Sequence, residues 1–462
     1  MTSQATSPIV RTEEVFSEES SAPFVPQPQS IEDVGLDFSL LVDLCVKSIY
    51  FAGRPTARQI SAHLALPFFA LVDELLSFLK REQLAEVVGS SGVGEQFYQY
   101  ALSNRGLEKV EEALARNHYV GPAPVPFTAY VDVVRRQSVT QMRVDPETVA
   151  RSLSHLVLDQ RVVASLGPAI SSGKSLLIHG HSGNGKTAIT AALKDMLPGE
   201  VLVPYAIDLG GTIIKVFDPR IHEERAPQLQ KDRRTSERLV SFLSAAERRR
   251  DRRWAVCSRP MVTAGGELTL ADLELRYSSI SKFYIAPLQL KANGGVLVVD
   301  DFGRQIIHPK ELLNRWIIPM EGGVDHLFLH SGDTIEVPFD VLLVFSTNIP
   351  PGRLGDEAFF RRIRYKVEVP DPTEEQILEI LRRACQERDI PYTDEDACYL
   401  IDRYYHREGR QFRGCHPRDL VELTTDICRY HGVRPALTPQ WLDLACGSYF
   451  VELDKETEPT TP

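Results

Sequence analysis

The sequence predicts an α/β fold, a parallel sheet flanked by helices, with a helical domain at the C-terminal end. Three short apolar runs carry this prediction, because each ends in residues that suit the ligand-binding edge of such a sheet. Residues 175–179 enter a glycine-rich segment, residues 296–299 end in two aspartates, and residues 341–345 end in Ser-Thr-Asn. Consecutive apolar residues are typical of strands that are buried on both faces.

Composition limits the class of protein. The chain has 462 residues, of which 43% are hydrophobic and 25% charged, so it has room for two or three globular domains. Its formal net charge of −11 gives no general attraction to nucleic acid or to an anionic membrane. No apolar run approaches the roughly 20 residues that span a bilayer, and no signal-peptide pattern opens the chain. We therefore expect a cytoplasmic protein with reduced cysteines and no membrane partner.

The N-terminal part is predicted to contain one small domain. Residues 1–34, like residues 451–462, are rich in polar residues and are predicted to be disordered tails. Residues 35–118 favour three helices, the third at 67–80, then a two-stranded hairpin and a final helix. This order resembles a winged helix-turn-helix domain. From Asp37 to Arg116 there are 8 Lys/Arg against 10 Asp/Glu, so docking of a protein is favoured over DNA binding, which normally needs a basic face.

The glycine-rich segment follows the pattern Gly-x-x-x-x-Gly-Lys-Thr, which indicates a phosphate-binding loop. Backbone N–H groups of such a loop surround phosphate oxygens, and the positive end of the next helix adds to the attraction. Lys186 is expected to reach the β- and γ-phosphates, and Thr187 to ligate Mg²⁺. We therefore expect ATP and Mg²⁺ as cofactors. The predicted nucleotide-binding residues are Gly180, His181, Ser182, Gly183, Asn184, Gly185, Lys186 and Thr187.

The other two strand ends carry residues that suit hydrolysis. Asp300 is expected to hold Mg²⁺ opposite Thr187, and Asp301 to orient and deprotonate the attacking water. Asn348 could hydrogen-bond that water or the γ-phosphate, although Thr-Asn also ends many strands as a plain turn. Together the three strand ends predict a catalytic edge of the sheet.

The order of these motifs resembles that of AAA+ ATPases over about residues 147–450. A phosphate loop, an acidic strand, a strand ending in Asn, an Arg-Arg pair and a helical tail with Pro-Arg follow one another. The resemblance implies a P-loop NTPase core of the AAA+ kind at 147–370 and a helical lid at 371–450, preceded by a linker at 119–146. It also implies an ATPase assembled as a homo-oligomeric ring, expected to be a hexamer.

The same resemblance assigns three further roles. Asn348 takes the position called sensor 1, and Arg418 that called sensor 2 on the lid. Arg362, or else Arg361, takes the position of the arginine finger that stabilises charge on a neighbouring subunit's nucleotide. Ordinary surface arginines at the start or end of a helix remain the alternative for all three arginines.

The chain departs from the family pattern in two ways. Asp301 stands where glutamate is commoner, and its shorter side chain suggests a poorly placed water and slow turnover. The long stretch between Lys186 and Asp300 predicts an insertion at about 219–290. Basic runs at 231–234 and 248–253 within it suit either a solvated charged helix, which is favoured, or a contact to nucleic acid or an acidic partner.

Four other segments have simpler explanations. Lys282-Phe283-Tyr284 could be a pore loop, but core packing is favoured for its aromatic residues. Residues 324–339 favour a hairpin, and residues 207–215, which resemble a sugar-kinase phosphate loop, favour another that turns at 210–211. Five cysteines between 385 and 446 are expected to be buried thiols, a metal site being the alternative.

Three functions remain open at this point. The favoured one is remodelling of a protein client that docks on residues 35–118. A DNA-linked motor or transcription regulator would use that domain and the basic insertion to hold nucleic acid. A slow nucleotide-dependent switch is suggested by Asp301.

Overall fold

A computed structural model describes residues 22–225, 249–354 and 360–450 of the chain. Five parallel strands form its central sheet, which confirms the predicted α/β fold class. In spatial order the strands are β16 (Tyr365–Glu368), β4 (Leu176–His179), β15 (Leu342–Thr347), β12 (Val296–Val299) and β9 (Met261–Ala264). Since all five run the same way, their carboxyl ends meet at one edge of the sheet.

Helices cover both faces of this sheet, as the apolar strands predict. One face packs on α7 (Pro146–Ser152), α8 (Gln160–Ser171) and α9 (Lys186–Met196), and the other on α12 (Pro309–Gly322). Successive strand residues alternate between these faces, so that Leu176 contacts the first group and Leu177 contacts the second. Trp316 of α12 is fully buried against the second face.

Extra strands form two further sheets beside the core, and most of these strands lie between α9 and β12 in the sequence. A five-stranded mixed sheet contains β10 (Arg276–Ser278), β11 (Phe283–Ile285), β7 (Thr212–Lys215), β6 (Ala206–Leu209) and β3 (Val125–Pro126). A separate antiparallel pair is formed by β5 (Glu200–Pro204) and β8 (Trp254–Ser258). Additional structure therefore begins at Glu200, before the predicted insertion at 219–290. The basic run at 231–234 lies outside the described residues.

Both predicted hairpins are confirmed. Strands β6 and β7 pair antiparallel around a turn at Gly210 and Gly211, whose φ angles of +58° and +89° suit glycine. Strands β13 (Val324–Phe328) and β14 (Thr334–Pro338) form the second hairpin. The likeness of residues 207–215 to a sugar-kinase loop is thus explained by a turn between strands.

The N-terminal unit has the predicted order of elements. It contains α2 (Phe38–Ala52), α3 (Ala57–Leu64), α4 (Asp73–Arg81), β1 (Ala85–Ser90), β2 (Tyr98–Leu102) and α5 (Asn104–Arg116). The predicted third helix at 67–80 is wrong in its first part, because Phe69 and Ala70 leave the helical backbone and Ala70 has a φ of +72°. Phe69 is 77% exposed as a result. The likeness to a winged helix stays a prediction.

The prediction of a disordered N-terminus is wrong for residues 22–34. Gln27 N donates to Arg249 O at 2.7 Å, and Asp251 N donates to Val25 O at 2.9 Å. Val34, in the short helix α1 (Ile31–Val34), is fully buried. The polar composition of residues 22–34 did not indicate that residues 249–251 would pair with them. This pairing supplies hydrogen bonds to their backbone groups. Residues 1–21 and the predicted tail at 451–462 lie outside the described part of the chain.

Arg253 joins the N-terminal unit to the core. Its guanidinium is buried and pairs with Asp251 at 2.9 Å. It also donates to the backbone oxygens of Val34 at 2.8 Å and Pro124 at 3.2 Å. The prediction of a solvated helix is therefore wrong for Arg253, at the C-terminal end of the basic run 248–253.

The predicted core packing of the aromatic residues in Lys282–Tyr284 is confirmed. Tyr284 is 6% exposed, and the ring of Phe283 lies edge-on to that of Tyr119 with their centroids 5.9 Å apart. The Lys282 ammonium donates to Ala115 O at 2.6 Å. Lys282 and Phe283 thus contact the N-terminal part of the chain, and Tyr284 packs in the core.

In the described residues 371–450, four α-helices form the C-terminal unit, with a hydrophobic core of their own. They are α15 (Glu374–Glu387), α16 (Asp394–Ile401), α17 (His416–Tyr430) and α18 (Pro439–Tyr449). Burial is confirmed for Cys385, Cys428 and Cys446, whereas Cys398 is exposed and Cys415 half-buried. Within the described ranges, no group of three or more His, Cys, Asp or Glu side chains is arranged to hold a metal ion.

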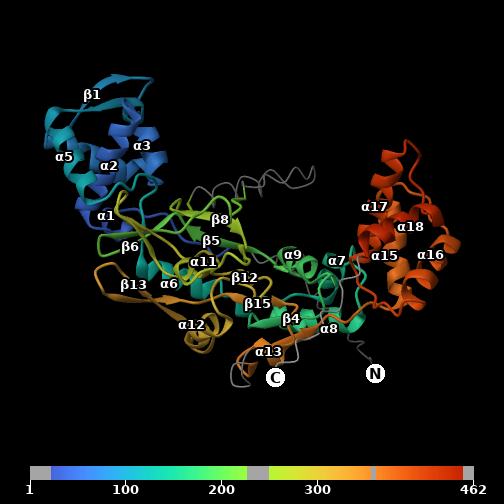
Figure 1. The fold of residues 1–462 in the computed structure, drawn as a ribbon. Helices are drawn as coiled ribbons and strands as arrows, with labels where there is room; N and C mark the ends of the chain where they lie inside the picture. The colour runs from blue at the N-terminus through green and yellow to red at the C-terminus, as the bar shows by residue number, and fades with distance from the viewer. Residues whose placement is uncertain (1–21, 226–248, 355–359, 451–462) are drawn as a thin grey trace, which may run out of the picture.

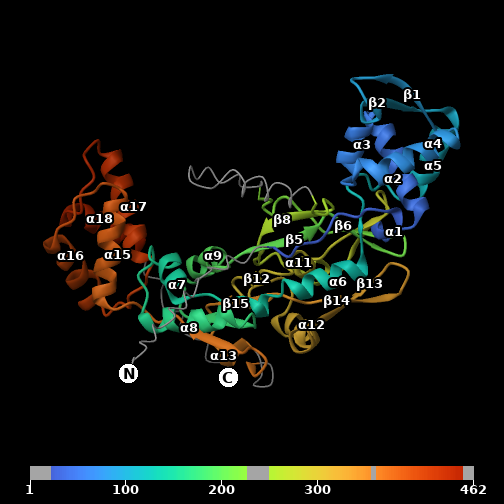
Figure 2. The same cartoon turned by 180° about the vertical axis from the view of Figure 1, so that it is seen from behind.

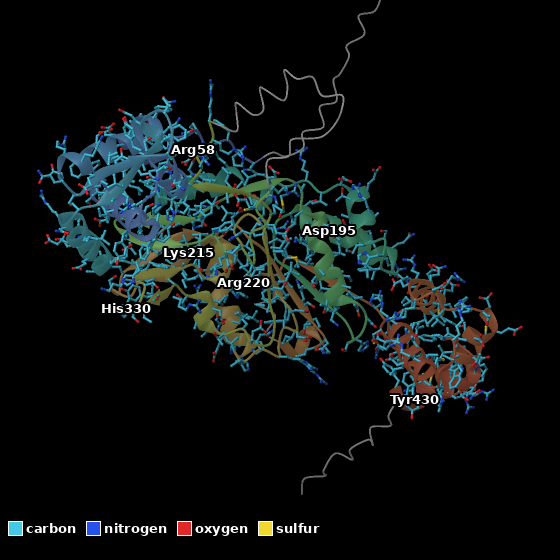
Figure 3. The ribbon with its side chains drawn as sticks, turned by 90° about the horizontal axis from the view of Figure 1, so that it is seen from above. Arg58, Asp195, Lys215, Arg220, His330 and Tyr430 are labelled. Atoms are coloured by element: carbon cyan, nitrogen blue, oxygen red, sulfur yellow. The ribbon has the colours of Figure 1, made fainter. Side chains whose placement is uncertain are left out.

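The three parts follow one another along an elongated molecule. The N-terminal unit and the C-terminal helices lie at opposite ends of the core in both side views (Figures 1 and 2). The view from above gives the same order, with Arg58 at one end and Tyr430 at the other (Figure 3).

In the described part of the chain, no single helix has the length and apolarity needed to cross a membrane. Helix α3 and the segment Phe68–Arg81 meet these criteria only as a pair bent by 82°. Their apolar residues Ile60, Leu64 and Leu75 are buried in the core of the N-terminal unit.

Candidate functional site

The glycine-rich loop connects strand β4 to helix α9 at the carboxyl edge of the sheet. Gly183 and Gly185 have φ angles of +83° and +82°, a left-handed conformation that favours glycine. A β-carbon at Gly180 would lie 2.3 Å from Val369 O, so the end of strand β16 leaves no room for a side chain there. The loop geometry thus explains its glycines.

Lys186 is held beneath this loop. Its ammonium donates to Gly180 O at 2.9 Å and to His181 O at 2.8 Å, and the residue is 7% exposed. Burial lowers the pKa of Lys186, while the nearby charges of Asp301 and Asp300 act in the opposite direction. A cation fixed at the mouth of a glycine loop is well placed for a phosphate group.

Thr187 and Asp300 meet although they are far apart in sequence. The Thr187 hydroxyl donates to Oδ2 of Asp300 at 3.0 Å, and Asp301 N donates to the other carboxylate oxygen at 3.0 Å. The Gln305 amide also donates to Asp300 O at 2.7 Å, which fixes the backbone after strand β12. A hydroxyl beside a carboxylate is an oxygen donor set that Mg²⁺ prefers.

Asp301 turns sharply away from the end of strand β12. Its φ of +50° lies in the left-handed region, which among non-glycine residues is mostly used by Asn and Asp. The side chain is exposed on the loop side of the sheet edge. This backbone gives a physical reason for aspartate at a position where the family resemblance implies glutamate.

Asn348 lies between the phosphate loop and the aspartate pair. Strand β15 separates β12 from β4, and its Thr347 pairs with His179, directly before Gly180. Among the described residues, Oδ1 of Asn348 is buried and has no hydrogen-bond partner. Such an atom in a folded protein usually accepts a hydrogen bond from water or a ligand. Three predicted groups therefore meet at one edge.

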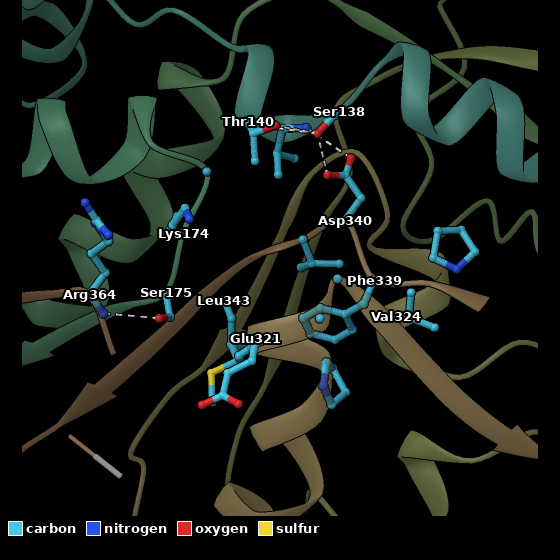
Figure 4. A pocket seen from close by; sticks show the side chains of 18 of the residues that line it. Ser138, Thr140, Lys174, Ser175, Glu321, Val324, Phe339, Asp340, Leu343 and Arg364 are labelled. Atoms are coloured by element: carbon cyan, nitrogen blue, oxygen red, sulfur yellow. Dashed lines mark hydrogen bonds between the residues drawn. The ribbon is translucent and has the colours of Figure 1, made fainter. Parts of the chain in front are cut away.

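Arg361 and Arg362 lie at the other end of the sheet. Ser175, just before strand β4, donates to Arg362 O at 3.0 Å, and the Arg362 Nε atom is 2.6 Å from Glu321 Oε1. Both arginines line a cavity of about 1160 Å³, in which Figure 4 labels Ser175, Glu321 and Arg364. The structure thus keeps the two predicted finger residues away from the loop of their own chain. Residues 355–359, in the segment that precedes them, lie outside the described ranges.

Arg418 does not contact the phosphate loop. It is exposed and lies 3.4 Å from Glu387 on the neighbouring helix α15, so its sensor role stays a prediction. The C-terminal arginine that lies at the loop is Arg413, which pairs with Asp371. Sequence reasoning missed both residues. A signal for Asp371 was available, since it stands between two prolines directly after the last core strand.

Known proteins offer limited similarity to this chain. A profile for a domain of unknown function (DUF8689) matches residues 373–448, the C-terminal helices. The search of curated proteins gives no match. The structure of NtrX from Brucella abortus in complex with ATP has a TM-score of 0.36 and 13% identity, covering 73% of this chain and only 61% of the NtrX chain.

The RuvB Holliday junction branch migration motor of Thermotoga maritima has a TM-score of 0.34 and 13% identity. This similarity covers 67% of the present chain and 73% of RuvB. At these scores the fold assignment rests on the strand order and the phosphate loop of this chain itself.

Proposed function

We propose that this chain, whose core is an α/β P-loop fold of the AAA+ kind, binds ATP with Mg²⁺ and hydrolyses it. The proposal depends mainly on the 3.0 Å hydrogen bond from the Thr187 hydroxyl to Asp300. This bond lies beside the phosphate loop, whose Lys186 is held by a backbone oxygen. The buried Oδ1 of Asn348, which has no hydrogen-bond partner among the described residues, adds a third group at the same edge. Thr187 and Asp300 would hold the ion, with phosphate and water oxygens completing its shell.

Each residue has a defined task in the proposed reaction. Lys186 and the loop N–H groups bind the β- and γ-phosphates, and bound Mg²⁺ would neutralise phosphate charge. Asn348 Oδ1 accepts one hydrogen of the attacking water, and Asp301 accepts its other proton as the oxygen–phosphorus bond forms. The bond from the γ-phosphorus to the bridging oxygen breaks, which gives ADP and inorganic phosphate.

A homo-oligomeric ring, expected to be a hexamer, is supported by the positions of the two arginines. Arg362 is at the amino end of strand β4, whereas the phosphate loop follows its carboxyl end. An arginine in that position can reach a nucleotide only if the nucleotide belongs to a neighbouring subunit. The proposed ring therefore places each active site at a subunit boundary.

A protein client is the favoured partner. A cavity of about 1230 Å³ lies between residues 22–34, here called the N-terminal arm, and the N-terminal unit, beside exposed Phe69. Its lining is largely apolar with two basic side chains, and includes Phe24, Pro26, Pro28, Pro67, Phe69, Arg249 and Arg252. Apolar clefts of this kind suit a peptide better than a phosphate backbone.

Nucleic acid is the weaker alternative. Lys47 of the N-terminal unit is fully buried and donates to Asn117, and Arg116 pairs with Asp43. Arg253 is internal as well. Lys47 and Arg253 are therefore engaged inside the molecule, Arg116 is exposed but paired, and the N-terminal unit is slightly acidic.

A slow nucleotide-dependent switch is the second candidate for the activity itself. Asp301 supports it, because its left-handed backbone and short side chain keep the carboxylate close to the strand end. A turnover number far below 1 per second with tight ATP binding would favour the switch over a motor.

The test measures binding of a fluorescent ATP analogue and phosphate release by the full chain. Lys186→Ala is expected to weaken binding by about 10- to 100-fold, because a charge-assisted contact is lost. Lys174→Ala is the matched control, since this exposed lysine lies at the opposite end of strand β4 and should leave binding unchanged. Equal affinities for Lys186→Ala and the wild type would remove the basis of the proposal.

A further inference from the structure

Asp371 joins the phosphate loop to the C-terminal unit. This residue follows strand β16, and its Oδ1 atom accepts from the Asn184 amide at 2.7 Å and lies 3.0 Å from His181 Nδ1. The same oxygen pairs with the guanidinium of Arg413, which precedes helix α17. Burial alone would raise the pKa of Asp371, but the hydrogen bonds from Asn184 and Arg413 lower it, so the carboxylate remains charged.

The backbone of the C-terminal unit also rests on the loop. Gly414 N donates to Asn184 Oδ1 at 3.3 Å, and a β-carbon at Gly414 would lie 3.1 Å from Gly183 O. In the other direction, a β-carbon at Gly183 would lie 2.5 Å from the sulfur of Cys415. Residues 413–415, here called the lid contact, therefore lie against the loop with no space between them.

The lid contact brings a second cation to the phosphate loop. Arg413 is 23% exposed, and its charge is close enough to Lys186 to lower the pKa of that lysine, after the larger effect of burial. Arg418, by contrast, is 57% exposed and faces Glu387. Of the two arginines, Arg413 is the one next to the place where the proposed phosphates bind.

We propose that Arg413 is the residue through which the C-terminal unit detects a triphosphate, and that Asp371 holds it when the loop has no nucleotide. This proposal rests on the proposed ATP binding. A triphosphate carries several negative charges against one on Asp371, and a guanidinium can contact two phosphate oxygens at once. When a triphosphate binds, Arg413 leaves the Asp371 carboxylate and pairs with the phosphates. The lid contact then stays closed through the bond between Arg413 and the phosphates.

Two cysteines make this exchange measurable in the full chain. Cys415 is half-buried against Gly183, and burial raises the pKa of its thiol, so an alkylating reagent should react there faster when the lid contact opens. Cys398 is exposed on helix α16 and serves as the internal control. Alkylation at each cysteine is followed by mass spectrometry of peptides, without nucleotide, with AMP and with ATP.

The expected result is specific to one arginine. Without nucleotide, Asp371→Asn and Arg413→Gln both speed alkylation of Cys415 roughly tenfold, while Cys398 is unchanged. ATP, but not AMP, restores slow alkylation in Asp371→Asn, because Arg413 then contacts phosphate. ATP does not restore it in Arg413→Gln. Arg418→Gln behaves as the wild type throughout.

Other outcomes would overturn the proposal. An unchanged Cys415 rate in both Asp371→Asn and Arg413→Gln would show that the ion pair does not hold the lid contact. Protection by ATP that is lost in Arg418→Gln but kept in Arg413→Gln would assign the role to Arg418. Failure of the wild type to bind ATP in the titration would reject the proposed function alone, because the nucleotide-free alkylation rates test the Asp371–Arg413 pair separately.

Discussion

The Ser175 hydroxyl and the backbone oxygen of Arg362 lie 3.0 Å apart, at the amino end of the strand whose carboxyl end carries the phosphate loop. Gly180 is five positions after Ser175, a distance of roughly 16 Å at the rise of a β-strand. Arg362 therefore needs a second chain to act on ATP. Lys186→Ala and Arg362→Ala, each inactive alone, should release phosphate when mixed, at up to about a quarter of the wild-type rate in a randomly mixed ring.

The mixing experiment has an internal comparison. Arg361→Ala replaces Arg362→Ala in a second mixture, and the arginine whose loss abolishes activity alone is the finger. A mixture that stays inactive, although each variant still assembles with the wild type in sedimentation, would contradict action between subunits.

Asp301 should tolerate neither a longer nor a neutral side chain. Asp301→Glu places a bulkier residue at a φ of +50° and should lower the free energy of unfolding by about 1 kcal/mol. Asp301→Asn keeps the shape but cannot accept a proton, so phosphate release should fall about 100-fold while ATP affinity is retained. Denaturant unfolding and single-turnover phosphate release measure the two effects. Equal rates in wild type and Asp301→Asn would show that another group accepts the proton.

Asn348 should matter for the reaction and little for the fold. Its buried Oδ1 makes no hydrogen bond to the described residues, so Asn348→Ala removes no protein contact of that atom. Phosphate release should nevertheless fall by about 10- to 100-fold, because the attacking water loses an orienting acceptor. A large drop in melting temperature with an unchanged rate would instead mark Asn348 as structural.

Arg253 should be essential for the position of the N-terminal arm. Arg253→Met leaves Asp251, which is 2% exposed, without its cation, a change that typically costs 3–5 kcal/mol. Denaturant unfolding measures the loss, and Arg252→Met, at the exposed neighbouring position, is the control. The double variant Arg253→Met with Asp251→Asn should recover part of the stability. An Arg253→Met protein as stable as the control would refute the internal role of this ion pair.

His416 should make the C-terminal unit sensitive to acid. Burial, and then the charges of Arg410 and Arg413, lower the pKa of His416 from 6.5 to about 4, although Asp419 opposes the shift. The unfolded chain therefore binds a proton at higher pH than the folded one. The stability due to neutral His416 is complete above pH 6.5 and is lost between pH 6.5 and 4, about 2 kcal/mol after allowance for partial exposure.

The measurement compares melting temperatures at pH 7.5 and 4.5. His416→Gln keeps a polar group near Tyr405, whose hydroxyl lies 3.1 Å from His416 Nδ1, but does not titrate. The variant should lose less stability on acidification than the wild type. Identical losses in the two proteins would assign the acid sensitivity to other groups.

Most of the candidate site was predictable because it lies on strand ends. In a parallel sheet, residues that follow buried strands come together whatever their separation in sequence, which is why Thr187, Asp300 and Asn348 could be grouped in advance. The catalytic roles of these residues are not determined by their positions alone. The geometry brings these groups together, and their parts in hydrolysis stay predictions until the variants are measured.

Contacts between separate units could not be predicted in the same way. Asp371 meets Arg413 only because the C-terminal helices lie in one particular orientation on the core, and local sequence does not encode that orientation. The Pro-Arg motif pointed to Arg418 instead. Residues 22–34 were missed because their order comes from a partner segment at 249–251, and the kink at Ala70 was missed because apolar spacing continues through it.

The hydrogen bond from Arg253 to Val34 has a consequence for the time at which this protein can finish folding. The two residues are 219 positions apart. A ribosome that adds 5–20 residues per second needs roughly 10–45 s to make that stretch. During this time the N-terminal arm cannot form its hydrogen bond with Arg253. We predict that the arm is cut by protease on stalled chains that end before residue 253 and protected on full-length chains. During synthesis, residues 22–34 therefore leave the ribosome well before the segment that fixes them in place.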